Sequence, residues 1–253
     1  MKHIRKIATL IFLFATSSIL GQQTKYDDKI SKFISFVKEN DSKSIAKNIS
    51  FPFRRKYPIP DIKNASEFLD RYHEIFDDSL KMIIAVSDIR KDWSEVGWRG
   101  IMLLNGIVWL DTNGKLTSVN YESKYEHDNR IRIITREKDL LNASIKDFKE
   151  PILAWETKKF RIRVDKLDND TYRYASWEIN KAPNEKPDII LTNGEVVFNG
   201  SGGNHDYLFK SGDYEYKCQV IVLGTIDSSP GYLIVTKNGT EILKERVIKN
   251  NRN

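Results

Sequence analysis

Residues 199–206 form the stretch of this 253-residue chain that is best suited to contact a ligand or a partner. Three glycines fall within four positions here, so the backbone can adopt left-handed conformations and approach another surface closely. A plain hairpin connection, which needs only about two to five residues, is the alternative interpretation. This stretch is longer, and it ends in polar side chains that can form hydrogen bonds with a partner. The predicted binding residues are Ser201, Gly202, Gly203, Asn204, His205, Asp206 and Tyr207.

Familiar catalytic and metal-binding motifs are missing from the sequence. Beyond residue 21 the histidines are His73, His127 and His205, and no two of them have metal-ligand spacing. There is no G-x-S-x-G elbow, no phosphate-binding glycine loop and no dinucleotide-binding G-x-G-x-x-G. We therefore expect no metal and no cofactor, and we expect His73 to be solvent-facing or partly packed on its helix. Carboxylates brought together from distant strands are an alternative catalytic arrangement that needs no local motif.

A basic triplet at positions 54–56 lies beside Tyr57 in a segment with three prolines, residues 51–62. Proline excludes regular helix and favours extended backbone, so we expect this segment to be extended and exposed. The triplet is a second candidate for contact with a partner, and a solvated loop is the alternative.

The first 21 residues have the layout of a secretory signal peptide. Lys2, Arg5 and Lys6 precede an uncharged apolar run at positions 7–20, and small residues follow up to Gly21. The run of 14 residues is short of the ~20 that span a bilayer, and no cysteine follows it for lipid attachment. We therefore predict cleavage near residue 22, a periplasmic or secreted location, and no stable membrane span after cleavage.

Charge and cysteine content exclude further classes of protein. Residues 1–21 carry three basic and no acidic side chains, so the formal charge falls from +6 to +3 without them, which gives little reason to expect nucleic-acid binding. The basic residues at 161 and 163 alternate with apolar ones, as on the solvated face of a strand. Cys218 is the only cysteine, so no internal disulfide can form, and we expect it to be a buried, inert thiol.

The chain after the signal peptide changes from helical to strand periodicity. Apolar spacing predicts helices at 25–38, 42–48 and 64–78, with a further piece to 84, followed by strands at 98–104, 107–111 and 115–122. Asn105-Gly106 and Asn113-Gly114 separate these strands and predict type I′ hairpins. Helices before a meander favour an α+β layout, with the helices packed on one sheet face.

Residues 124–149 read as a charged helix, broken near Asp139, that either packs on the first sheet or bridges two domains; Pro151 ends it. About eight short strands follow, with Asn193-Gly194 among the turns, and predict an all-β sandwich or small barrel. The predicted organisation is a signal peptide at 1–21, an α+β domain at 22–150 and an all-β domain at 151–253.

Two stretches resemble known groups of exported proteins. The segment from Phe51-Pro52-Phe53 through Gly106-Ile107-Val108-Trp109-Leu110 resembles exported bacterial proteins of unassigned function, which implies the helix-then-meander module and no activity. Residues 152–249 resemble periplasmic lysozyme inhibitors, through Gly200-Ser201-Gly202-Gly203 followed by Tyr207. That resemblance implies a small exported β-barrel that inserts a Ser/Gly-containing loop into the lysozyme cleft. Some such inhibitors have stabilising disulfides, which this chain cannot form internally.

These observations favour a binding protein over an enzyme. We expect an exported protein of the cell envelope that recognises a protein or a glycan through its glycine-rich loop. One alternative is an envelope hydrolase whose site is assembled from distant residues. Another is a carrier that holds a small apolar ligand between the helices and the sheet of the first domain.

Overall fold

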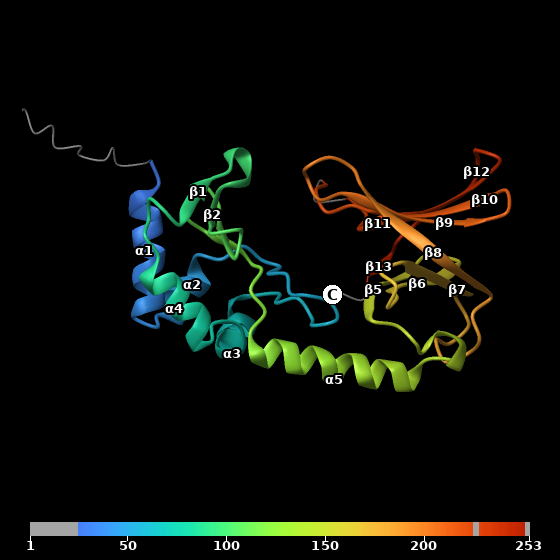
Figure 1. Ribbon diagram of the computed structural model, residues 1–253, viewed down its shortest axis with the longest axis horizontal. Helices are drawn as coiled ribbons and strands as arrows, with labels where there is room; N and C mark the ends of the chain where they lie inside the picture. Colours follow the sequence, from blue (N-terminus) through green and yellow to red (C-terminus); the bar gives the residue numbers. More distant parts are fainter. Residues whose placement is uncertain (1–24, 225–227, 251–253) are drawn as a thin grey trace, which may run out of the picture.

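The computed structural model describes residues 25–224 and 228–250 (Figure 1). The predicted signal peptide, residues 1–21, lies outside these ranges. The fold is α+β, as predicted: helices and a small antiparallel sheet come first, and a large, curled antiparallel sheet follows. None of the helices in the described ranges combines the length and the apolar character needed to cross a membrane.

Four helices begin the described chain, and their ends follow local capping signals. They are α1 (Asp27–Lys38), α2 (Ser42–Lys47), α3 (Ala65–Ile75) and α4 (Asp78–Val86). The Asn64 side chain accepts a hydrogen bond from the Glu67 backbone N–H at 3.0 Å, and the Glu67 carboxylate accepts one from the Lys63 N–H at 2.9 Å. This arrangement satisfies free N–H groups at the start of α3, so the predicted cap is confirmed.

The small sheet has the strand order β1-β2-β3-β4, and all its pairs are antiparallel. Its strands are β1 (Trp93–Glu95), β2 (Ile101–Leu103), β3 (Val108–Leu110) and β4 (Leu116–Val119), with a 3-10 turn, η1 (Gly97–Arg99), between the first two. Apolar side chains from the four helices and this sheet fill the space between them, as the predicted packing requires. Fully buried members of this core include Phe53, Ile62, Phe68, Ile75, Phe76, Leu80, Ile84, Leu103, Val108 and Leu110.

The predicted type I′ turns are wrong. Gly106 and Gly114 have positive φ, but the asparagines that precede them do not. In the second hairpin the Asp111 carboxylate accepts hydrogen bonds from the N–H groups of Asn113 and Lys115, both at 2.8 Å. That side chain stabilises a turn in which only the glycine needs the left-handed conformation.

Helix α5 (Lys124–Leu140) connects the small sheet with the large one and bonds to both sides of the molecule (Figure 1). Its Glu126 binds Arg55 of the proline segment, and its Glu137 binds Arg163 of the large sheet. The helix ends at Leu140, close to the predicted break, and a 3-10 turn, η2 (Ala143–Ile145), follows. Of the two predicted roles, the helix therefore has the bridging one. Apolar residues just beyond it pack on the large sheet: Leu141, Ile145 and Phe148 contact Ala175 and Trp177.

The large sheet contains nine strands in the described residues, in the order β12-β11-β10-β9-β8-β7-β6-β5-β13. They are β5 (Glu150–Glu156), β6 (Phe160–Lys166), β7 (Tyr172–Glu178), β8 (Ile189–Phe198), β9 (His205–Ser211), β10 (Tyr214–Val220), β11 (Gly231–Lys237), β12 (Thr240–Arg246) and β13 (Lys249–Asn250). Pro151 lies inside β5, at a register shift in its pairing with β6, and not at the end of a helix as predicted. A bulge at the sheet margin accommodates proline, which has no N–H for the ladder.

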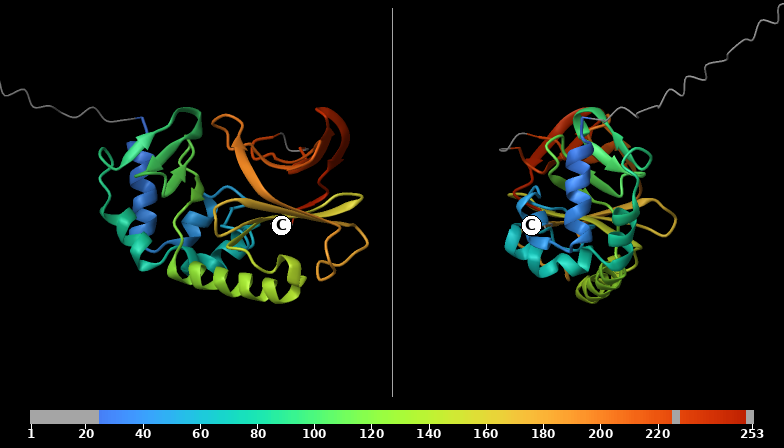
Figure 2. Two further views of the ribbon diagram at one scale, coloured as in Figure 1. Left: turned by 45° about the vertical axis from the view of Figure 1, so that its right-hand side comes forward. Right: turned by 90° about the vertical axis from the view of Figure 1, so that its left-hand side faces the viewer.

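Strand β8 curls the sheet. Its first residues pair with β7 and its last residues pair with β9, so one long strand belongs to both halves of the curl (Figure 2). The predicted turn at Asn193-Gly194 is wrong: the positions form an irregularity within β8, where Asn193 has a φ of 60°. A Cβ added to Gly194 would lie 2.1 Å from Cε1 of Phe209. Glycine is needed there because the Phe209 ring occupies the space of a side chain.

The end of the chain brings the two ends of the curled sheet together. The Val247 N–H donates to the Gly231 carbonyl at 3.1 Å, and the Ile248 N–H donates to the Glu156 carbonyl at 2.8 Å. The segment after β12 thus joins the first residue of β11 to the end of β5. The enclosed core includes Cys218, which is fully buried, as expected. Burial in this apolar core raises the pKa of the Cys218 thiol, which keeps it protonated and unreactive.

Candidate functional site

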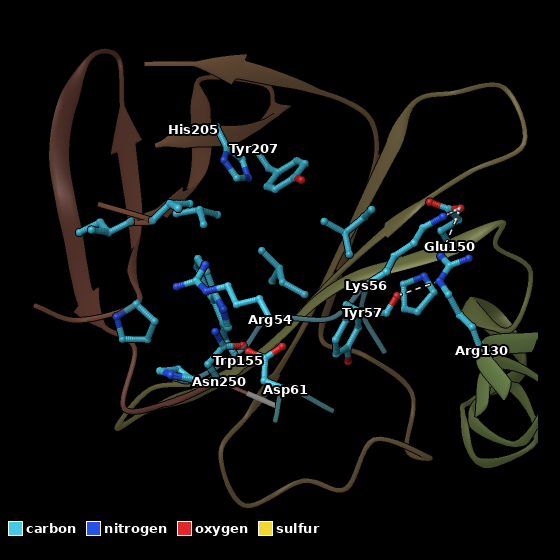
Figure 3. Close-up of a pocket in the computed structure, with 18 residues that line it drawn as sticks. Arg54, Lys56, Tyr57, Asp61, Arg130, Glu150, Trp155, His205, Tyr207 and Asn250 are labelled. Carbon is cyan, nitrogen blue, oxygen red and sulfur yellow. Dashed lines mark hydrogen bonds and ion pairs between the residues drawn. The ribbon is translucent and has the colours of Figure 1, made fainter. Parts of the chain in front are cut away.

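A cleft of about 390 Å³ lies between the proline segment, residues 51–62, and the mouth of the curled sheet (Figure 3). Its volume is in the range of small-molecule and cofactor sites, and such sites are common where two parts of a protein meet. The cleft is lined by both parts of the molecule. Its polar and aromatic lining residues are Arg54, Lys56, Tyr57, Asp61, Arg130, Glu150, Trp155, His205, Tyr207 and Asn250.

Short-range bonds hold the proline segment in one conformation. The backbones of Phe53 and Ile62 exchange hydrogen bonds of 2.8 and 2.9 Å, and the Arg55 N–H donates to the Asp61 carboxylate at 2.9 Å. Phe53, Arg55 and Tyr57 are buried, whereas Arg54 and Lys56 between them are exposed. This alternation is typical of extended backbone and directs the two exposed cations to the cleft. The sequence predicted an extended basic triplet, and two of its three members are exposed.

Arg55, the third member of the triplet, has a structural role. Its Nε donates to Glu126 at 2.6 Å and its second terminal nitrogen also contacts that carboxylate. Further donors reach the backbone carbonyls of Val119 at 2.7 Å and Tyr121 at 3.1 Å. Arg55 therefore fastens the cleft-forming segment to α5 and to the end of the small sheet.

Glu150 connects the proline segment, α5 and the first strand of the large sheet. Arg130 lies 3.2 Å from its carboxylate, and Lys56 lies 3.9 Å from it (Figure 3). Arg130 also donates from Nε to the Tyr57 carbonyl at 2.9 Å. Arg130 and Glu150 therefore largely neutralise each other, and their ion pair fixes the geometry of this side of the cleft.

Arg54 is different from the other cations of the cleft. Its side chain makes no ion pair or hydrogen bond with the residues that the structure describes. The lining contains three cations, Arg54, Lys56 and Arg130, against two carboxylates, Asp61 and Glu150. Lys56 also pairs with Glu122 at 3.2 Å, so Arg54 is the lining cation whose donors are not occupied by described residues.

His205 and Tyr207 line the opposite side of the cleft, at the start of β9. Nδ1 of His205 lies 2.8 Å from the Gly203 carbonyl, so the neutral ring carries its proton on Nδ1 and leaves Nε2 as an acceptor. The His205 ring packs edge-on against Tyr207, with 5.2 Å between ring centroids. Both side chains point to the cleft because residues two apart on a strand share a face.

The glycine-rich loop of the predicted site is fastened beside the cleft. Asn204 accepts hydrogen bonds through Oδ1 from the N–H groups of Val222 and Leu223, at 2.8 and 2.9 Å. A Cβ on Gly202 would lie 2.8 Å from the Leu223 side chain, so close packing explains a glycine there. Asn204 is therefore a structural residue of the loop, whereas Asn199, Gly200 and Ser201 at its start are exposed.

Of the predicted residues, the structure places His205 and Tyr207 in the cleft and Asp206 on the other face of β9. Asp206 is buried, and its Oδ1 has no hydrogen bond from the described residues. His73 and His127 are exposed and do not line the cleft. The described ranges contain no cluster of three or more His, Cys, Asp or Glu side chains suited to a metal ion.

Sequence reasoning missed Asp61, Glu150, Trp155 and Asn250. They are spread over almost 200 positions, and none belongs to a local motif. They come together because the end of the chain returns to β5 and because α5 holds the proline segment beside that strand. Comparison of the chain with protein-family models, with curated proteins and with solved structures gives no match.

Proposed function

We propose that this is an exported binding protein that holds a segment of glycan in the cleft between the proline segment and the curled sheet. The observation that carries the proposal is the pairing of an unoccupied cation, Arg54, on one side with His205 and Tyr207 on the other. The predicted loop then forms a margin of the site, and the cleft beside it makes the contacts.

The lining suits sugars because it offers donors, acceptors and aromatic surface together. Each sugar hydroxyl both donates and accepts hydrogen bonds, while the C–H groups of a sugar ring pack well on aromatic rings. Arg54 supplies donors, and the half-buried His205 supplies an acceptor at Nε2 and an aromatic ring, which packs on the buried Tyr207. A few well-placed polar groups in a partly apolar cleft are the usual composition of a specific binding site.

Binding is favoured over hydrolysis by the bonds that the cleft carboxylates already make. Asp61 accepts the Arg55 N–H, and Glu150 is held by Arg130 and Lys56. Within the described residues His205 bonds to a backbone carbonyl and makes no hydrogen bond with a carboxylate. A general acid or base needs a titrating group that is free to exchange its proton with a substrate.

The proposal is tested by calorimetric titration of the purified protein with soluble oligosaccharides of N-acetylglucosamine. The test variant is His205→Ala, and the matched control is His127→Ala, which removes an exposed histidine of α5 outside the cleft. We expect binding that is weakened about tenfold or more in the first variant, because it loses the acceptor and the ring contact with Tyr207, and unchanged in the second. Equal affinities in all three proteins would place the binding site elsewhere.

A protein partner is the second candidate, and one observation favours it. Phe198, at the end of β8 next to the glycine-rich loop, is 67% exposed, and exposed aromatic side chains are common anchors in interfaces. Inhibition assays with several lysozyme types test this version directly. Phe198→Ala is expected to reduce any inhibition, whereas Ile242→Ala, an exposed residue of the distant edge strand β12, is expected to leave it unchanged. No inhibition and no lysozyme binding would exclude an inhibitor.

A further inference from the structure

The backbone around Arg54 is held in one conformation without a bound ligand. Phe53 on one side is fully buried and bonded to Ile62, and Arg55 on the other side is buried and bonded to Glu126. The segment therefore has little freedom to lose when the Arg54 side chain makes a contact. Such preorganisation increases affinity because less ordering entropy is lost on binding.

Other charges around Arg54 already have partners. The Asp61 carboxylate accepts the Arg55 backbone N–H, Glu150 forms an ion pair with Arg130 at 3.2 Å, and Lys56 donates to Glu122 at 3.2 Å. Figure 3 marks interactions at Glu150 and none at the Arg54 guanidinium. Arg54 is exposed at the cleft and presents a fork of donors, and a planar anion can occupy two of these donors at once.

We infer that the ligand carries a carboxylate and that Arg54 binds it. This inference rests on the proposed glycan-binding function and adds the class of glycan, one that contains an acidic sugar. Arg54 is the lining cation without a partner among the described residues, and its single charge matches a carboxylate monoanion. A phosphate dianion would leave one negative charge uncompensated next to Asp61 and Glu150, which disfavours it. His205 then contacts the neutral part of the sugar through Nε2 and its ring.

The test uses two disaccharides that differ only in a lactyl ether group, which carries the carboxylate: N-acetylglucosaminyl-N-acetylmuramic acid and di-N-acetylchitobiose. The variants are Arg54→Gln and Arg54→Lys, with Arg136→Gln as the matched control, because Arg136 is an exposed arginine of α5 outside the cleft. Circular dichroism and the thermal midpoint show whether each variant keeps its fold. The exposed position of Arg54 leads us to expect that they do.

We expect the unmodified protein and Arg136→Gln to bind the acidic disaccharide about tenfold to a hundredfold more tightly than the neutral one. Arg54→Gln is expected to lose this preference while it still binds the neutral disaccharide, and Arg54→Lys to retain part of it. The preference is expected to shrink as salt is added, because ions screen the contact.

The outcomes separate this inference from the function on which it rests. Equal affinity for both disaccharides, or a preference that survives Arg54→Gln, would overturn the role of Arg54 and leave glycan binding standing. Displacement of the acidic disaccharide by inorganic phosphate at lower concentration than by acetate would overturn the choice of a carboxylate. Binding of neither disaccharide by the unmodified protein would contradict the proposed function and this inference together.

Discussion

Replacing Glu126 by Gln tests the buried ion pair that holds the cleft in place. The Arg55 and Glu126 side chains are only 3% and 2% exposed, and two guanidinium nitrogens contact the carboxylate. The remaining Arg55 donors reach the carbonyls of Val119 and Tyr121, so the amide variant leaves the arginine in place but without a countercharge. Its positive charge is then buried and uncompensated.

Breaking a buried pair by removing one charge costs about 3–5 kcal/mol. The Gln amide oxygen can still accept one of the two guanidinium bonds, so we expect a loss near the lower end, about 3 kcal/mol. A domain of this kind has a total stability of about 5–15 kcal/mol, so Glu126→Gln should remove a fifth or more of it. Because Arg55 separates Arg54 from Lys56, affinity for any cleft ligand should fall as well.

Urea unfolding, followed by tryptophan fluorescence and by circular dichroism, measures the loss if the two transitions coincide. The matched control is Asp128→Asn, another acid-to-amide change on α5. Asp128 pairs with Lys124 on the surface, where ion pairs contribute little, so the unfolding midpoint should hardly move. A loss of less than about 1 kcal/mol in Glu126→Gln would refute the view that this pair fastens the proline segment to the helix.

Three further predictions concern the cores. Burial raises the pKa of the Cys218 thiol, so a thiol reagent should label this cysteine in urea and not in the folded protein, as absorbance of the released product would show. Burial also raises the pKa of Tyr72 from 10.0 to about 12, so between these pH values the unfolded chain loses a proton that the folded protein keeps, and the free energy of unfolding should fall. Unfolding of Tyr72→Phe should show a smaller decline, because Cys218 and Tyr174, whose pKa values burial also raises, still contribute to it. Since the Tyr72 hydroxyl has no hydrogen bond with described residues, the variant should lose little stability at neutral pH. Finally, Gly194→Ala should cost about 1–3 kcal/mol in urea unfolding, because the new methyl group would overlap the Phe209 ring; unchanged stability would contradict the packing described for β8.

Local chemistry made the helices and the general architecture predictable. The cap formed by Asn64 and Glu67 involves residues three apart, and the apolar spacing of α1 needs only one turn of helix to be recognised. The shift to strand periodicity likewise separates the helical part from the curled sheet. Such signals can be recognised without the tertiary structure because the residues that interact are close together in the sequence.

Other features depended on residues far away along the chain. Asn193-Gly194 has the composition of a turn, yet it lies within β8, since the Phe209 ring needs the space above the glycine. Arg55 is one of three consecutive basic residues, but it is buried because it forms an ion pair with Glu126. Neither outcome is visible in the residues next to these positions.

For the candidate site, the amino-acid sequence alone determined one side, the polar stretch that ends in His205 and Tyr207. The tertiary structure decided the other side, because Arg54 meets these residues only after α5 has set the proline segment beside β5. A loop can be recognised from glycines and polar groups that are neighbours in the chain. A cleft results from long-range packing and from ion pairs between distant residues, and no short stretch of sequence contains that information.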